Sequence, residues 1–408
     1  MYSTRGYNHP PARGQPYPAQ TSRGYLPPDY LELANNGGMN PQGMSGPMLD
    51  HDLFGGRPPL PPLIPYRPHF GRYNTGPMPG MGPQPGPMGY SGGEIIPYGG
   101  QNAMDMVHQC TGRKRALLIG INYIGQSHPL KGCINDAYRM RDLLTSLYNF
   151  HDNDMVILTD DNPDPRAQPT RTNLIRAMHW LVANAQPTDS YFFHYSGHGT
   201  QTVDVSGDEI DGYDETILPV DFRTAGMILD DEMNAIMVRL LPLGCRLTAV
   251  FDSCHSGTAL DLPFVYDYRG RLEKHPIVDA TRDALGRVQT NYMAGDYYMA
   301  GRSVLESLRT VVRGPAIRRR QLRSRSTLGD VVMFSGCADD ESSADSYDYA
   351  LGNTGAMSNA LVMVLRNNPN QSYAQILRGV RDILRGRYNQ RPQLSTGRYM
   401  DMNRMFIL

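Results

Sequence analysis

From residue 115 onward, short apolar runs alternate with longer stretches in which apolar residues recur at helical spacing. The apolar runs, which have the composition of buried strands, are 116–121, 155–158, 191–195, 247–251 and 331–334. The helical stretches are 133–147, 170–185, 230–241, 355–366 and 373–384. In the third of them, Asp230 or Asp231 has the position of an N-cap. Continuous apolar strands separated by helices are typical of a mostly parallel sheet flanked by helices. The pattern therefore predicts an α/β fold.

Residues 1–106 lack this pattern. Twenty of the 32 prolines lie in the first hundred residues, interleaved with Gly, Gln, Tyr and Met. Such a segment cannot bury enough apolar surface to offset the entropy that it would lose on folding. We therefore predict a disordered N-terminal tail at 1–106 and one α/β domain at 107–408.

A basic segment interrupts this domain. Between Tyr268 and Thr327, 13 Lys or Arg residues stand against five Asp or Glu, with a cluster at Arg318, Arg319, Arg320, Arg323 and Arg325. Loops this long inside a compact domain are generally functional or disordered. An RNA-binding segment is one interpretation, but the scarcity of aromatic residues favours an exposed proteolytic site. The loop, about 269–327, separates a larger region at about 107–268 from a smaller one at about 328–408.

Charge and cysteine usage restrict the class of protein. The formal net charge of −1 argues against a protein that coats nucleic acid. The five cysteines include no CxxC pair, which disfavours a disulfide framework and a zinc site. No apolar run reaches transmembrane length, and the N-terminus lacks the apolar core of a secretory signal. We expect a cytoplasmic protein, also present in the nucleus, with neither nucleic acid nor membrane as partner.

Two glycine-flanked polar clusters follow apolar strands. The first is 194–199, which contains His198, and the second is 252–257, which contains Cys254. Since the carboxyl ends of parallel strands meet at one edge of a sheet, the thiol and the imidazole should be neighbours there. A thiolate with an adjacent base is a nucleophile. A buried structural cysteine or histidine is the alternative, but both residues lie in polar turns rather than apolar runs. We interpret the pair as a catalytic dyad.

Four segments in order, 116–123, 130–137, 194–199 and 252–257, resemble the metacaspases. The Pro/Gln/Tyr/Gly-rich tail narrows the resemblance to the fungal type I metacaspases, over about 114–408. It implies a caspase-haemoglobinase fold with a six-stranded sheet, in which 1–106 is a prodomain and the two regions of the domain are subunit-like. It further implies a cysteine endopeptidase with Arg or Lys at the P1 position, made as a zymogen, cleaved autocatalytically, and linked to apoptosis.

The substrate pocket follows partly from the residues and partly from the resemblance. Asp252 lies two positions before Cys254, so on a strand both side chains point the same way. A fork of two carboxylates suits a guanidinium. The resemblance completes this S1 pocket with Cys133, Asp136 and Ser196, and it assigns the oxyanion to the backbone N–H groups of Gly199 and Cys254. Alternatively, Asp252 orients a loop and Asp136 caps the helix after it.

Acidic residues are dense between 204 and 231. They are Asp204, Asp208, Glu209, Asp211, Asp214, Glu215, Asp221, Asp230 and Asp231. Such hard oxygen ligands suit calcium, but Glu209 stands where an EF-hand requires glycine, which excludes that motif. The resemblance places calcium on Asp214, Asp230, Asp231 and Asp261, and self-cleavage after Arg325. A solvated acidic loop, with Asp230 as a helix cap, is the alternative.

Two rival functions remain. The Tyr/Gln/Gly-rich tail is of a kind that self-associates, so the protein could act in aggregate handling, with proteolysis secondary. A hydrolase acting on something other than peptides is the other. The principal prediction is a monomeric, calcium-activated peptidase whose prodomain self-associates.

Overall fold

The computed structural model describes eight segments of the chain. They are 26–36, 110–204, 213–253, 256–272, 327–338, 346–348, 352–385 and 390–408. Cys254, Arg325 and acidic residues 208, 209 and 211 lie outside them. The chain divides into two compact units. All eight segments belong to the first unit, which consists of residues 1–37 together with residues 108–408. The other unit, 38–107, lies outside the described residues.

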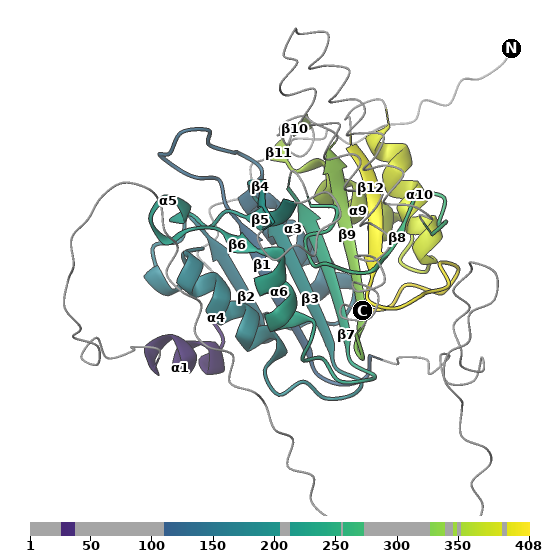
Figure 1. Ribbon diagram of the computed structural model, residues 1–408, viewed down its shortest axis with the longest axis horizontal. Coiled ribbons are helices and arrows are strands. Elements are labelled where there is room, and N and C mark those ends of the chain that lie inside the picture. The colour runs from purple at the N-terminus through teal and green to yellow at the C-terminus, as the bar shows by residue number, and fades with distance from the viewer. Residues whose placement is uncertain are drawn as a thin grey trace, which may run out of the picture. The chain divides into compact units, whose positions relative to one another are not determined.

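The main sheet has seven strands in the order β2-β1-β3-β7-β9-β12-β8 (Figure 1). In chain order these are β1 (Lys114–Gly120), β2 (Met155–Thr159), β3 (Ser190–Ser196), β7 (Arg246–Asp252), β8 (Phe264–Tyr266), β9 (Asp330–Ala338) and β12 (Gln390–Thr396). The first five in the sheet are parallel, whereas β12 runs antiparallel to β9 and to β8. The predicted α/β class is confirmed. The expected six strands are one too few, because the three-residue strand β8 adds to the outer side of β12.

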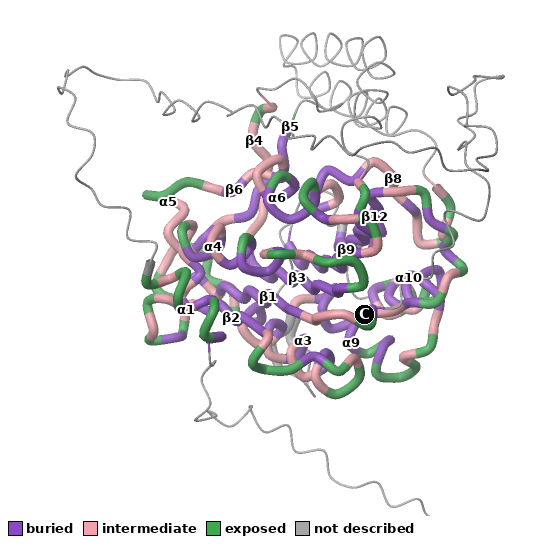
Figure 2. The backbone as a smooth tube through the Cα atoms, turned by 90° about the horizontal axis from the view of Figure 1, so that it is seen from below, coloured by how far each residue is buried: buried purple, intermediate pink, exposed green. Residues whose placement is uncertain are grey.

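The central strands are buried because helices cover both faces of the sheet. Every residue of β3 and β7 is buried, which explains their uninterrupted apolar sequences. On one face the core includes residues of α4 (Arg171–Val182) and α6 (Asp230–Met237). On the other it includes residues of α3 (Cys133–Leu147), α9 (Ala356–Asn367) and α10 (Tyr373–Leu384). Figure 2 shows the buried positions gathered in the central strands and the helix surfaces that pack on them.

Helix starts follow the capping rules unevenly. The Thr170 hydroxyl accepts from the Asn173 amide at α4, and Ser372 forms a capping box with Gln375 at α10. At α6 the N-cap is Leu229, so the prediction that Asp230 or Asp231 is the N-cap is wrong by one position. Both aspartates lie in the first turn, where the helix dipole favours negative charge.

Smaller elements surround the sheet. An antiparallel three-stranded sheet consists of β4 (Gly199–Val203), β5 (Tyr213–Ile217) and β6 (Ile228–Leu229). The strands β10 (Ser346–Asp348) and β11 (Gly352–Thr354) form a hairpin-like pair, and α5 (Phe222–Ala225) precedes β6. Short 3₁₀ turns cover Asp152–Asp154 and Pro165–Ala167. Among the described residues, no helix is long and apolar enough to cross a membrane.

One helix lies inside the tail for which we predict disorder. It is α1 (Pro28–Asn36), and it packs on α4. Leu26 and Tyr30 are buried there as part of the domain core. The disorder prediction therefore does not hold for this segment, because Leu26 and Tyr30 are buried against the domain and Asp29 pairs with Arg115.

Candidate active site

His198 follows β3, and two tyrosines hold its main chain. Its amide donates to the Tyr123 hydroxyl at 3.0 Å, and its carbonyl accepts from the Tyr195 hydroxyl at 2.7 Å. Burial raises the pKa of both phenols, so both stay protonated. A Cβ at Gly197 would lie 2.7 Å from the Tyr195 hydroxyl, which explains the glycine before His198. The two phenols thus fix the position of the imidazole.

The imidazole ring of His198 has a defined orientation. It lies against the Tyr123 ring, with centroids 4.5 Å apart, and its Nε2 donates to the His128 carbonyl at 2.8 Å. A carbonyl can only accept, so Nε2 carries the proton and Nδ1 is the acceptor in the neutral ring. The sequence did not indicate His128, because its contribution is a backbone oxygen and not a side chain.

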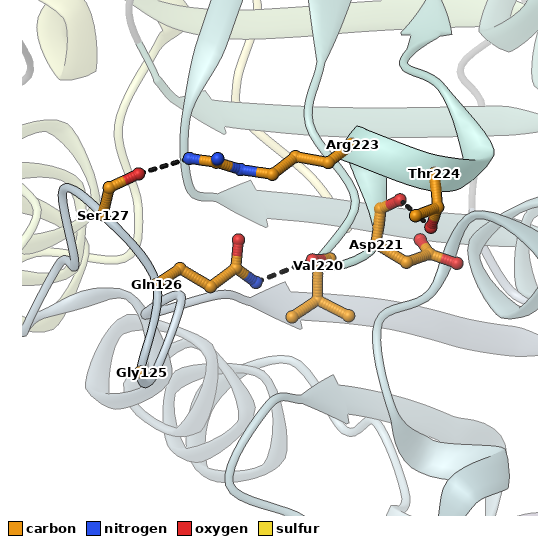
Figure 3. A pocket seen from close by; sticks show the side chains of 7 residues that line it. All are labelled: Gly125, Gln126, Ser127, Val220, Asp221, Arg223 and Thr224. Carbon is orange, nitrogen blue, oxygen red and sulfur yellow. Dashed lines mark hydrogen bonds between the residues drawn. The ribbon is translucent and has the colours of Figure 1, made fainter.

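A loop with unusual backbone angles presents that oxygen. Tyr123, Gly125 and His128 have φ angles of 53°, 77° and 61°, in the left-handed region. A pocket of about 460 Å³ lies between residues 125–127 and 220–224, and Figure 3 shows the residues that line it. Gln126 Nε2 donates to the Val220 carbonyl at 2.7 Å, and Arg223 donates to the Ser127 hydroxyl. These two bonds across the pocket hold the loop that carries His128.

The strand that leads to Cys254 is the direct neighbour of the strand that leads to His198. In the register of β3 and β7, Ser196 pairs with Asp252, so both strands end at the same level. The Ser256 hydroxyl donates to the Ser253 carbonyl at 3.0 Å. The expected adjacency of the two strand ends is therefore present. Cys254 itself lies outside the described residues.

Two carboxylates meet at the carboxyl end of β7. Asp136 Oδ2 accepts from the Ser196 hydroxyl at 2.9 Å and from the Gly355 amide at 2.8 Å. Asp252 Oδ2 accepts from the Ser358 amide at 2.6 Å. A Cβ at Gly355 would lie 2.3 Å from Asp252 Oδ2 and 2.7 Å from Asp136 Oδ2. Both carboxylates therefore flank the same backbone position at the start of α9.

The pair is electrostatically strained. Burial, and then the charge of Asp252, raises the pKa of Asp136 well above its usual range. Asp136 Oδ1 has no hydrogen-bond partner among the described residues. Cys133 lies one helical turn before Asp136 on α3 and is buried. The structure thus joins Asp136, Ser196 and Asp252, with Cys133 close by on the same helix.

The alternative roles of the two aspartates, Asp136 as a helix cap and Asp252 as the residue that orients a loop, are present only in part. Asp136 does not cap its own helix, because the N-cap of α3 is Gly132, which makes no side-chain cap bond. Both carboxylates instead accept amides from the start of α9. Gly355 and Ser358 were missed in the sequence because they contribute backbone amides, which leave no signal in residue type.

His194 connects the same helix to the sheet. Its Nε2 lies 2.9 Å from the Ser358 hydroxyl, and burial lowers the pKa of His194 to about 3. The ring is therefore neutral at physiological pH. Its partner is the hydroxyl of Ser358, on helix α9.

Three of the four predicted calcium ligands are buried. Asp214, Asp230 and Asp261 are 6%, 1% and 2% exposed, whereas Asp231 is partly exposed. Burial raises the pKa of Asp230, whose Oδ2 accepts from the Glu215 amide at 2.9 Å. In the described part of the chain, no three His, Cys, Asp or Glu side chains are grouped so that they could hold a metal ion. Calcium binding by these four aspartates stays a prediction.

Comparison with known proteins identifies the family. The family description "Metacaspase, peptidase C14 domain" matches residues 114–263. Metacaspase-1B of Neurospora crassa is 51% identical over 301 residues, which are 74% of this chain and 70% of that protein. Metacaspase-1 of Emericella nidulans is 49% identical over 300 residues, or 74% of each chain. Metacaspase-1A of Aspergillus terreus is 42% identical over 408 residues, 99% of this chain and 93% of that protein.

Among solved structures, a protein from Geobacter sulfurreducens is similar over 72% of this chain and 97% of its own, with 23% identity and a TM-score of 0.45. The family rests on the sequence relatives, which share about half of their residues with this chain across most of their own length. The resemblance found in the four motifs is confirmed. The chain belongs to the fungal type I metacaspases, cysteine-type endopeptidases of peptidase family C14.

Proposed function

We propose that this peptidase cleaves after Arg or Lys and that Asp136 and Asp252 form the S1 pocket. The observation that carries the proposal is the buried carboxylate pair on either side of Gly355. Two buried like charges repel each other, and a guanidinium or ammonium from the substrate relieves that repulsion. The hydrogen-bonding capacity left at Asp136 Oδ1 supports a cationic partner.

The catalytic roles follow from the orientation of His198. With Nε2–H donated to the His128 carbonyl, Nδ1 takes the proton from the Cys254 thiol, and the thiolate attacks the scissile carbonyl. The resulting imidazolium then protonates the leaving amine, and water hydrolyses the thioester. We assign the oxyanion to the backbone N–H groups of Gly199 and Cys254. No side chain is needed as a third member, because a backbone carbonyl orients the ring.

Reporter peptides that end in Arg, Lys or Asp test the proposed specificity. We expect cleavage after Arg and Lys only, and we expect Asp136→Asn and Asp252→Asn each to cost about 3–5 kcal/mol of transition-state binding. The exposed carboxylate of Asp161 supplies a matched control, Asp161→Asn, which should leave cleavage unchanged. Efficient cleavage after Asp by the unmodified enzyme would overturn the pocket assignment.

The dyad is tested separately. Cys254→Ala and His198→Ala should each abolish most turnover, and the double variant should lose little more, because the two groups act as one unit. Activity retained in Cys254→Ala would contradict the proposed mechanism and would make Cys133 the candidate nucleophile.

We also propose that the enzyme cleaves itself in the basic loop, after Arg325, and that calcium triggers this step. A substrate segment within the same chain has a high effective concentration. The position is supported by β9, which begins at Asp330, so that a cut after Arg325 leaves its pairing intact. For calcium, the support is the acidic density in the sequence alone, because the described carboxylates are not grouped. No step of the mechanism depends on the metal.

A further inference from the structure

The helix α1 lies far from the candidate active site. Its neighbour in the domain is α4, and its salt-bridge partner is Arg115, at the amino end of β1. His198 follows the carboxyl end of β3, which is parallel to β1. Figure 1 shows α1 beside α4, at the opposite end of the strands from β4 and β5. Helix α1 therefore lies away from His198.

The contacts of α1 resemble those of a bound peptide. Tyr30 is 0% exposed, its hydroxyl donates to the Arg166 carbonyl at 3.1 Å, and its ring packs edge-on against Trp180 with centroids 6.2 Å apart. Burial raises the pKa of Tyr30 to about 12, so the hydroxyl remains a donor. One buried aromatic anchor in a pocket is the usual core of such an interface.

An ion pair fixes the orientation of the helix. Asp29 pairs with Arg115, whose guanidinium lies 4.6 Å from the Trp180 ring centroid and donates to the Trp180 carbonyl at 2.7 Å. The Arg115 side chain is 8% exposed, and that of Asp29 is 49% exposed. In this ion pair, the domain surface therefore contributes Arg115, and the N-terminal tail contributes Asp29.

The helix depends on this surface for its stability. Isolated helices of nine residues are marginal in water. Leu26 and Tyr30 face the domain, whereas Glu32 and Leu33 are exposed. Folding of the segment and its docking are therefore coupled, as in other helix-in-groove recognition.

We infer that residues 26–36 form a docking segment that binds the peptidase domain of its own chain. The residues of the domain that it contacts include Arg115, Arg166 and Trp180. This contact keeps the N-terminal tail attached to the domain even when the chain between residues 37 and 109 is cut. The inference does not depend on which peptide bonds the enzyme cleaves.

The test uses the full-length chain with Cys254→Ala, which prevents self-cleavage. A recognition sequence for a site-specific protease is inserted after Gly80, the protein is cut there, and the fragments are separated by size exclusion over a dilution series. We expect the N-terminal fragment to co-elute with the rest of the chain. Tyr30→Ala should weaken its retention by roughly 100-fold or more, as expected for loss of a buried aromatic side chain.

Two further variants separate specific docking from general loss of stability. Asp29→Ala should weaken retention about twofold to fivefold, since its ion pair is half exposed. Glu32→Ala removes an exposed carboxylate from the same helix and should change nothing. Thermal unfolding of each uncut variant checks that the domain is intact.

Three outcomes would overturn the inference. The unmodified N-terminal fragment could separate as readily as that of Tyr30→Ala. Equal retention of the unmodified and Tyr30→Ala fragments would show that another contact holds the tail. A dimer of the uncut protein that disappears in Tyr30→Ala, seen by light scattering, would show that the segment docks on a second copy.

Discussion

At the scale of single residues, the proposed S1 pocket lowers the stability of the folded protein, and the same two carboxylates recognise the substrate cation. Asp136 is buried next to Asp252, and both repulsion and desolvation act against the ionised pair in the absence of a cation. The amides of Gly355 and Ser358 offset part of that cost, because they donate to the two carboxylates. Two carboxylates buried side by side should be a weak point of the free enzyme.

Asp136→Asn should therefore raise the thermal stability of the protein while it removes cleavage after Arg and Lys. The folded-state pKa of Asp136 is raised, so the folded protein binds this proton more tightly than the unfolded chain does. Stability of the unmodified protein should then fall as pH rises through the interval between the ordinary and the raised pKa. The variant should lack this part of the pH dependence in the free energy of unfolding, measured by urea titration from about pH 4 to about pH 7. A variant less stable than the parent at neutral pH contradicts the argument.

Gly355→Ala should damage the same site by crowding. The added Cβ would lie within 3 Å of one oxygen of each carboxylate, so a carboxylate or the start of α9 must move. Displacements of this size cost roughly 100-fold in kcat/KM. Gly379→Ala is the control, because its Cβ would meet only the Val364 side chain. Unchanged kcat/KM in Gly355→Ala would show that the pocket is wider than the structure has it.

At the scale of elements, the sequence predicted what is periodic and buried. The apolar pattern predicts the positions of five strands and two helices correctly: β1, β2, β3, β7, β9, α3 and α10. A strand buried on both faces is a continuous apolar run, and a helix buried along one stripe has apolar residues at helical spacing, so both are visible in the sequence. Strand β12 was missed, since its residues 390–396 are mostly polar and include a proline. The hairpin of β4 and β5 is partly exposed and shows no such pattern either.

The same distinction separates the site groups that the sequence indicated from those that it did not. Asp252 could be named from its position before Cys254, and Asp136 and Ser196 from the metacaspase resemblance, because side chains are visible in the sequence. The His128 carbonyl and the Gly355 and Ser358 amides could not, since every residue carries a carbonyl and nearly every residue an amide N–H, and only the fold brings these particular groups to the site.

The elements β5 and α6 also bear on calcium. We expect calcium at millimolar levels to activate the enzyme by binding carboxylates of these two elements and of Asp261. We expect calcium to raise the melting temperature of the Cys254→Ala protein and magnesium to have little effect. Asp230→Asn should abolish the shift, whereas Asp161→Asn should preserve it. Equal peptidase activity in excess chelator and in calcium would contradict the proposal that calcium activates the enzyme.

At the scale of the whole molecule, the order of strands in the sheet determines whether the products of self-cleavage stay together. A cut after Arg325 would assign β7 and β8 to the N-terminal fragment and β9 and β12 to the C-terminal one. In the sheet, β9 and β12 lie between β7 and β8, so both outer sides of the C-terminal pair are bonded to the other fragment. Separation would require both ladders to break.

Calcium treatment should therefore yield two fragments that co-purify under native conditions and separate only in denaturant. Cys254→Ala should remain intact, and mass spectrometry should find the new terminus after Arg325. A cut at Arg318 to Arg323 would correct only the position. The absence of any new terminus between Arg269 and Thr327 in active enzyme would refute self-cleavage.

The contact between Asp136 and Gly355 has a further consequence for a processed enzyme. Its two partners lie on opposite sides of the basic loop, so after the cut one pocket is shared by two polypeptides. The processed enzyme is then a heterodimer and obeys mass action. Its specific activity should fall on extreme dilution, recover on concentration, and, in mixtures of two variants, reveal whether halves from different molecules can be exchanged.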